Sequence, residues 1–400
     1  MKSKTHTLFS ICTLFVILWG LYGFHWYDCA KGTLLDSLSN VFLGINILVC
    51  LYCVFNLQGK RLPSFFAGVN ILLFTFVIYG GLYIVGGETR YVNGEPINKG
   101  SYLIGILRSY LPIYAFYFFA RKGYVNLKNI TIYLIILLAF SLLYNIYVTI
   151  FWVSIGYESG FTNNLGYLFI SFFPFVFLYK DKSIFQYILL ALILGLTLSS
   201  MKRGAILIAI ILFFWFIHIK TSHVRMSKRI KIFFLSFVIV SIGAFYLNDL
   251  YESSIFFQRR IELTVEGNSS GRDVLYTRLL NYYWYDASWY QQLFGSGPDT
   301  SFDIIGKEAH NDWLEILTSQ GLLGVIVYLF FWINSYIYWK RIPKNRVYYP
   351  IVGAYLIIMF TRTFFSMSYA TVPTAATLIL GYSIAMNEIQ NKLNRAKKIN

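Results

Sequence analysis

The sequence predicts an all-α polytopic membrane protein with about 12 transmembrane helices and one long extracytoplasmic loop. First, the 400 residues are 57% hydrophobic and only 13% charged. That composition excludes a disordered chain and a nucleic-acid-binding domain. Second, apolar segments of about the 20 residues that span a bilayer recur along the chain. Third, the basic residues fall in alternate loops, as the positive-inside rule requires.

The apolar segments predict spans at positions that follow one another closely, except for one gap. The first follows the basic start MKSKTH and resembles a signal peptide, but it lacks a small-residue cleavage site, so we expect a retained helix. An insertion at 249–320 separates the ninth and tenth spans, and we expect 1–400 to form a single integral membrane domain. The predicted spans lie near 7–25, 37–57, 64–86, 101–120, 130–153, 164–179, 183–200, 204–219, 232–248, 321–339, 347–365 and 370–388.

Charge distribution predicts the orientation. Most of the 34 Lys and Arg residues fall in the set of loops that includes the N-terminus, where Asp181 and Glu388 are the only acidic residues. This asymmetry predicts that both termini are cytoplasmic and that 249–320 lies outside. The net charge of +16 therefore marks the cytoplasmic face of a membrane and requires no nucleic-acid partner.

Motifs for metals and nucleotides are missing from the sequence. There is no HExxH, paired CxxC, P-loop or GxGxxG, and three of the four cysteines lie inside apolar runs. We therefore predict no metal site and no cofactor, with the cysteines serving as small apolar residues.

Polar and charged residues concentrate in 268–324 and at one short turn upstream. Lys202 and Arg203 lie in that turn, on the predicted outer side, where cations are costly unless they reach water or meet an anion. Contact with lipid headgroup phosphates is the alternative to a functional role.

Arg272 follows Ser and Gly residues and begins an apolar pattern that continues to Tyr283. This pattern predicts a helix, and an Arg beside a helix start suits an anion. An exposed Arg in an ordinary loop is the alternative. Arg278 and Arg362 are further candidates for anion contact, with headgroup contact as the alternative for Arg362.

His310 is a candidate general base. Glu308, Asp312 and Glu315 lie close in sequence and could orient it or alter its charge, although a lone His is often structural. Asn311 follows directly, at the start of a predicted helix. The GSG at 295–297 predicts a plain turn or, less specifically, a close backbone approach to a phosphate.

Three motifs together resemble the O-antigen polymerase and ligase family of bacterial envelope glycosyltransferases. They are SSMKRGA at 199–205, SSGRDVLY at 269–276 with LFGSGP at 293–298, and AHNDWLEILTSQGLLG at 309–324. Tyr276 stands where relatives often carry Trp, and Lys202 where many have a small polar residue.

The resemblance implies a GT-C-like fold in the bacterial inner membrane, acting at the outer leaflet. It implies transfer of a glycan from undecaprenyl diphosphate to an acceptor hydroxyl, with His310, Arg272 and Arg203 catalytic and Lys202, Asn311, Arg278 and Arg362 binding substrate. The implied partners are the lipid-linked oligosaccharide, an acceptor glycan, membrane lipid, and chain-length regulator and flippase proteins.

Polymerisation of polysaccharide repeats is the favoured activity, because no appended domain to capture a protein acceptor is visible. The alternatives are ligation of the glycan to lipid A core or to protein and, in another class, a transporter or flippase. Against transport, no internal symmetry is visible and the charged residues gather at the outer edge of the spans.

Overall fold

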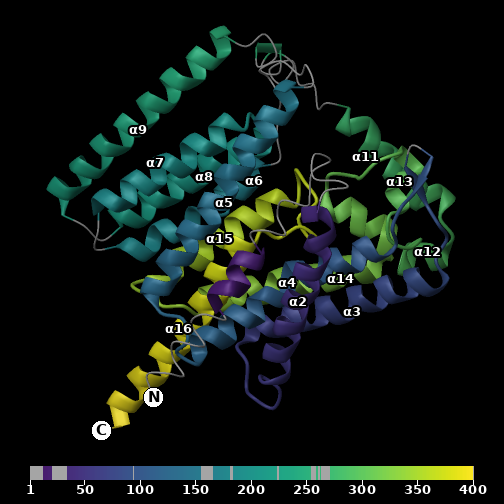
Figure 1. The fold of residues 1–400 in the computed structure, drawn as a ribbon, viewed down its shortest axis with the longest axis horizontal. Helices are drawn as coiled ribbons and strands as arrows, with labels where there is room; N and C mark the ends of the chain where they lie inside the picture. Colours follow the sequence, from purple (N-terminus) through teal and green to yellow (C-terminus); the bar gives the residue numbers. More distant parts are fainter. Residues whose placement is uncertain are drawn as a thin grey trace.

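The protein is an all-α bundle whose long apolar helices identify it as a multi-pass membrane protein (Figure 1). The computed structural model describes residues 12–19, 34–92, 94–154, 165–180, 183–222, 225–253, 258–259, 262 and 271–399. In these ranges, seven helices are long and apolar enough to cross a membrane. Part of the predicted span 7–25 and part of the insertion 249–320 lie outside the described residues.

Helices or helical segments lie at every predicted span, and four more short helical segments lie within the insertion. Residues 12–19 form a helix within the predicted span 7–25. The others are α2 (Leu34–Phe55), α3 (Ser64–Gly86), α4 (Gly100–Arg121), α5 (Leu127–Ser154), α6 (Leu165–Ile170), η3 (Phe173–Tyr179), α7 (Ser183–Ser199), α8 (Arg203–Thr221), α9 (Met226–Ser253), α11 (Arg272–Asn281), η4 (Tyr282–Asp286), α12 (Trp289–Phe294), α13 (Thr300–Ile305), α14 (Asp312–Lys340), α15 (Tyr348–Arg362) and α16 (Thr374–Ile399).

Helix α4 forms the centre of the bundle. In its most apolar window 83% of the residues are buried, against 6% for α9, which stands at the edge of the bundle in Figure 1. α4 packs against α2, α3 and α16, and α15 packs against α8, η3 and α16. Other helices cover α4 but not α9, so we expect the apolar side chains of α9 to face lipid.

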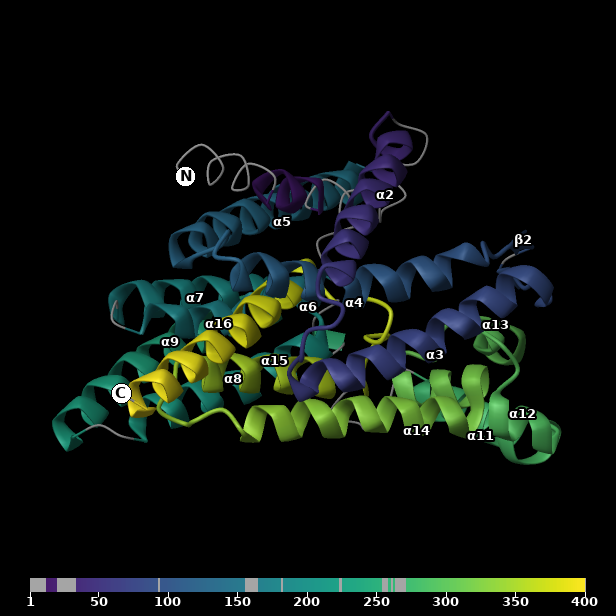
Figure 2. The same ribbon diagram turned by 90° about the horizontal axis from the view of Figure 1, so that it is seen from below.

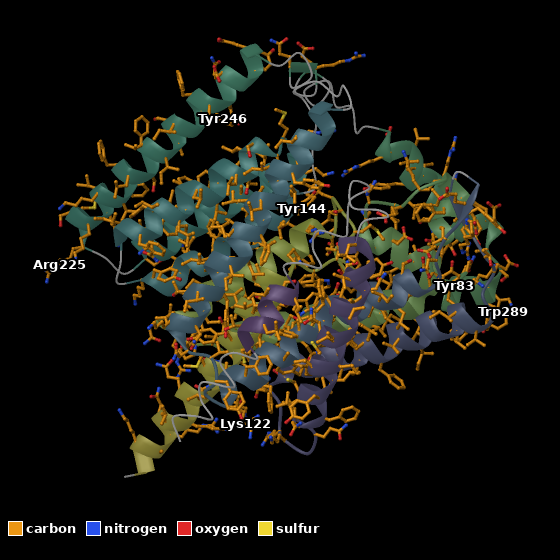
Figure 3. The ribbon with its side chains drawn as sticks, in the orientation of Figure 1. Tyr83, Lys122, Tyr144, Arg225, Tyr246 and Trp289 are labelled. Atoms are coloured by element: carbon orange, nitrogen blue, oxygen red, sulfur yellow. The ribbon has the colours of Figure 1, made fainter. Side chains whose placement is uncertain are left out.

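Helices α3 and α14 run beside each other and carry the polar segment at one end (Figure 2). There α11, α12 and α13 gather with a short hairpin of β1 (Tyr91–Val92) and β2 (Glu95–Pro96), in which Tyr91 pairs with Pro96. Figure 3 shows Tyr83 and Trp289 at this end, and Lys122 and Arg225 at other edges of the molecule.

Two predicted spans differ from the structure in form. The predicted span 164–179 is α6 followed by a turn and the 3₁₀ helix η3, with Pro174 at the start of η3, where its missing N–H leaves no bond unmade. The predicted span 321–339 is the second part of α14, which begins nine residues earlier at Asp312 and contains a non-helical residue, Gly321.

Candidate functional site

Cations from three elements that are far apart in the sequence meet beside Tyr167 of α6. Lys202 Nζ lies 5.9 Å from the centre of the Tyr167 ring, and Arg362 Cζ lies 5.0 Å from it. Arg272 Nη2 donates to the carbonyl of Phe365 at 3.4 Å, and the Tyr167 hydroxyl donates to the same carbonyl at 3.4 Å. The start of α8, the start of α11 and the end of α15 therefore converge.

Arg203 joins this group as the first residue of α8, directly after Lys202. Its guanidinium is close enough to Arg272 for the two charges to repel each other. We call Lys202, Arg203, Arg272 and Arg362 the cation cluster. Since like charges at short range repel, a bound anion would lower the electrostatic energy of the cluster.

His310 lies next to the cation cluster, between α13 and α14. Its side chain is 47% exposed, and its Nδ1 lies 4.0 Å from Glu308 Oε2. Partial burial, and then the positive charges of Lys202, Arg272 and Lys307, lower the pKa of His310 from 6.5 to about 4. The imidazole is therefore neutral at neutral pH and is able to accept a proton.

Positive backbone φ angles occur at two non-glycine positions in contact with this site. His310 has φ +53°, and Met201, which directly precedes Lys202, has φ +50°. Such a conformation costs an L-residue about 1–2 kcal/mol. Strain of this kind persists only where the surroundings hold it, and it is common at functional sites.

Asn311 is the N-cap of α14. Its Oδ1 accepts hydrogen bonds from the backbone N–H groups of Trp313 at 3.0 Å and Leu314 at 3.2 Å. The amide oxygen is thereby occupied, since an N-cap satisfies the free N–H groups of the first helical turn. Asn311 fixes where α14 begins, directly after His310.

Glu315 holds the backbone in front of His310. Its carboxylate is 1% exposed and accepts a hydrogen bond from the N–H of Ala309 at 3.0 Å. The Ser301 hydroxyl of α13 donates to the other oxygen at 2.8 Å. The sequence predicted that Glu315 could orient His310, and the structure shows that it contacts the adjoining backbone.

Asp312 ties α14 to the connection between α15 and α16. It is fully buried and accepts hydrogen bonds from the Ser368 N–H at 2.7 Å and from the Tyr328 hydroxyl at 2.7 Å. Its own N–H donates to the Thr363 carbonyl at 2.8 Å. The same connection carries Phe365, whose carbonyl binds Arg272, so α14 and α11 are positioned on one common support.

The structure separates the two remaining arginine candidates. Arg362 is 7% exposed, and its guanidinium donates to the carbonyl of Thr371 at 2.9 Å and to its hydroxyl at 2.8 Å. It is a fixed charge of the cluster. Arg278 is exposed in the last turn of α11, six residues beyond Arg272, and no contact in the described part of the chain joins it to the cluster.

The GSG turn at 295–297 packs against the backbone of α14. Ser296 N donates to the Thr318 carbonyl at 2.9 Å, and Gly297 N donates to the Ser319 carbonyl at 2.9 Å. A Cβ on Gly295 would lie 2.3 Å from Gln320 N, so only glycine fits. The close approach that the sequence suggested is to protein backbone, and the N–H groups of Ser296 and Gly297 are occupied by carbonyls.

Arg90, directly before β1, is a buried charged residue of the polar segment's surroundings that the sequence analysis missed. It is 7% exposed, forms an ion pair with Asp303 of α13 and donates to the Ser296 carbonyl at 2.6 Å. Asp299 lies beside Arg90 and Tyr83, and burial raises the pKa of its carboxyl. The dipeptide Asn93-Gly94, a common hairpin turn, was a signal for this element; Asn93 itself lies outside the described residues.

Within the described ranges, no group of three His, Cys, Asp or Glu side chains is placed to hold a metal ion. The cation cluster gathers positive charge beside His310, and fixed cations of this kind suit an anion. No protein-family model matches the chain, and no curated protein matches it. The functional assignment therefore depends on these residues and their geometry.

Proposed function

We propose that the protein is a membrane glycosyltransferase that polymerises polysaccharide, transferring a glycan from undecaprenyl diphosphate to an acceptor sugar hydroxyl at the outer leaflet. The supporting observation is that the turn with Lys202 and Arg203 meets Arg272 from a distant part of the sequence, and that the charges of Lys202 and Arg272 act on His310. The three motifs that resemble the O-antigen polymerase and ligase family contain these same residues.

The proposed reaction is an in-line displacement with inversion at the anomeric carbon. The acceptor oxygen attacks that carbon, the bond to the diphosphate oxygen breaks, and the electron pair leaves with undecaprenyl diphosphate. Arg203 and Arg272 stabilise the charge that develops there, because guanidinium groups pair with diphosphate oxygens and remain protonated. In this proposal they supply the positive charge that a metal ion supplies in other transferases.

His310 takes the proton from the acceptor hydroxyl. Its pKa of about 4 makes it neutral at neutral pH, but also makes it a weak base. The negative charge of a bound diphosphate opposes the charges of Lys202 and Arg272, and so raises the pKa of His310. In this scheme the imidazole becomes a better base when the donor is in place.

The proposed topology has about 12 spans in the bacterial inner membrane, with both termini cytoplasmic and the segment 249–320 outside. The support for this orientation is the distribution of basic residues. Lys60, Lys122, Arg225 and Arg341 all lie in the loops that the charge distribution places inside. In this orientation the cation cluster faces the outer side of the membrane, where the proposed lipid-linked glycan donor is present.

The test is glycan transfer by the purified protein in lipid, with an undecaprenyl-diphosphate-linked oligosaccharide as donor. His310→Asn is the sharpest variant, because Asn tolerates a positive φ better than most residues and lacks the base. We expect turnover about 10²–10⁴-fold lower. Arg272→Gln should lower it about 10²–10³-fold. Arg225→Gln, at an exposed position on another edge of the molecule, is the control.

Each result bears on a separate part of the proposal. Full turnover by His310→Asn would show that His310 is not the general base. Loss of wild-type turnover in chelator would show that the displacement depends on a metal ion. Accumulation of single repeats on the acceptor in a deletion strain indicates a polymerase, and loss of all attachment indicates a ligase. Glycan movement across liposomes that His310→Asn leaves unchanged would indicate a transporter.

A further inference from the structure

A polar cavity that shares no lining residue with the cation cluster lies at the loops that the charge distribution places in the cytoplasm. Its volume is about 620 Å³, and it lies between Lys180 after η3, the connection from α14 to α15, and the C-terminal half of α16. The lining residues include Lys180, Arg346, Tyr348, Gln390, Leu393 and Asn394.

Arg346 is a cation held in place by neutral groups. Its Nη1 donates to the side-chain oxygens of Asn387 and Asn391 of α16, each at 2.7 Å. No carboxylate pairs with it among the described residues, so its charge is positioned but not neutralised by protein. Fixed guanidinium groups of this kind suit phosphate oxygens.

The charge of the cavity is positive. Lys180 adds a second cation at the exposed rim, and none of the described lining residues is acidic. Glu388, the acidic residue of the neighbouring part of α16, accepts a hydrogen bond from Tyr117 of α4 and lies 3.4 Å from Lys392. The carboxylate is engaged by these groups, and among the described residues no ion pair joins it to Arg346.

The cavity also has an apolar side. Met386, Ile389 and Leu393 of α16, together with Pro343 and Val347, form this side. A free inorganic anion gains nothing from such a surface, whereas the glycerol and first methylene groups of a phospholipid do. The lining therefore matches an amphiphile whose polar end is anionic.

Aromatic residues beside the cavity mark the level of the lipid headgroups. Tyr349, next to the lining residue Tyr348, stacks on Trp339 at 5.1 Å between ring centres, and Trp339 Nε1 donates to the Tyr349 carbonyl at 3.0 Å. Lys340 lies 5.1 Å from the Trp339 ring. Trp and Tyr with Lys are typical of a membrane–water interface, which is where a headgroup would lie.

We propose that this cavity binds the phosphodiester headgroup of an anionic phospholipid. Arg346 and Lys180 contact the phosphate, the amides of Gln390 and Asn394 contact the headgroup, and the apolar lining holds the start of the acyl chains. The bound lipid would join η3, the α14–α15 connection and α16. Basic cavities between membrane helices on the cytoplasmic side are suited to such lipids.

The test is native mass spectrometry of the full chain from detergent, with phosphatidylglycerol or phosphatidylcholine added at equal concentration. We expect the wild type to retain phosphatidylglycerol in preference to phosphatidylcholine. Arg346→Gln and Lys180→Gln should each weaken retention of phosphatidylglycerol about tenfold, the effect of losing one charge-assisted hydrogen bond. Arg61→Gln, an exposed cation in a loop predicted on the same side, is the matched control and should retain it fully.

Two variants are needed because Arg346 also bonds α16, and its loss could disturb the fold. Lys180 is exposed, so Lys180→Gln tests binding without that complication. Equal retention of the two lipids, or variants that behave like Arg61→Gln, would overturn the proposal. A rise in melting temperature with inorganic phosphate equal to that with phosphatidylglycerol would assign the cavity to free phosphate and overturn the lipid proposal.

Discussion

At the scale of single residues, the charge of His310 determines the expected pH dependence. Its pKa lies below 6.5, so the imidazole stays neutral until the pH falls to about 4. The acid limb of kcat/KM reports the free enzyme, and we expect it near pH 4. The acid limb of kcat reports the donor complex, in which the diphosphate raises the pKa, so it should lie at higher pH. A pH–rate profile measures both.

The cations provide the control for this prediction. Lys202→Gln removes one of the charges that lower the pKa of His310, so the acid limb of kcat/KM should move up towards 6.5. Arg225→Gln changes an equal charge at another edge of the molecule and should leave the limb in place. An acid limb near 6.5 in the wild type would contradict the electrostatic account of the site.

Glu315 is predicted to act as a positioning residue for His310. In Glu315→Gln one acceptor oxygen becomes an NH2 donor. If the amide oxygen keeps the Ala309 N–H, the Ser301 hydroxyl must accept from that NH2, and its own buried proton loses its acceptor. We expect a loss of about 1–3 kcal/mol in unfolding free energy. We also expect a fall in kcat with little change in KM, because the imidazole moves while the cations that bind the donor do not.

Glu308→Gln is the comparison, since Glu308 is half-exposed and lies 4.0 Å from the same imidazole. It should leave thermal stability near that of the wild type. If Glu315→Gln has a lower melting temperature but the wild-type kcat, Glu315 has a structural role only. Melting curves and donor-saturated rates separate these outcomes.

At the scale of secondary-structure elements, the non-helical residue Gly321 of α14 packs against the backbone at Leu293 and Gly295, at the end of α12. Gly321 has φ +64°, and a Cβ there would lie 2.5 Å from Gly295 N and from the Leu293 carbonyl group. Gly321→Ala therefore combines a positive φ with a clash against backbone. We expect it to cost about 1–3 kcal/mol more than a substitution that incurs the φ penalty alone.

Gly306→Ala is that substitution, because Gly306 has φ +72° and nothing within 4 Å of its Cβ position. Thermal unfolding of the two variants in the same detergent gives the difference directly. If both lose the same stability, the contact between the turn at 295–297 and α14 is not tight. Loss of transfer activity in Gly321→Ala with little loss in Gly306→Ala would show that this contact also positions the site.

The sequence predicted the positions of the long helices well. It did not predict the short hairpin or the buried contacts of the segments between the helices. The predicted spans 64–86 and 101–120 agree with α3 and α4 to within one residue, because apolar length alone defines such a helix. The hairpin that places Arg90 is too short to show a hydrophobic period. The roles of Asp312 and Glu315 depend on which backbone N–H groups lie opposite them, and that is a property of the packed structure.

The candidate site was predictable in composition but not in geometry. Lys202, Arg203, Arg272 and His310 were expected to act together, and the structure brings all four close. Spacing along a chain does not show that Arg278 is exposed while Arg362 is buried under Tyr167. Those differences arise from helix rotation and from the connection after α15, which a pattern of single residues does not encode.

For the molecule as a whole, the orientation in the membrane is the premise on which the proposed donor depends. Trp289 lies with the polar segment and is 71% exposed, whereas Lys122 and Arg225 are exposed in loops predicted inside (Figure 3). Single Cys substitutions at these positions, in a background lacking the four native cysteines, are tested with an impermeant maleimide on intact spheroplasts.

We expect Trp289→Cys to be labelled on intact spheroplasts, and Lys122→Cys and Arg225→Cys only after the membrane is permeabilised. The physical reason is the excess of Lys and Arg in the loops that hold Lys122 and Arg225, which favours their retention in the cytoplasm. The reverse pattern would place the cation cluster at the inner leaflet, where nucleotide-activated donors are present. A donor already carried to the outer leaflet would then be out of reach, and the proposed polymerase activity would be wrong even if His310 proved essential.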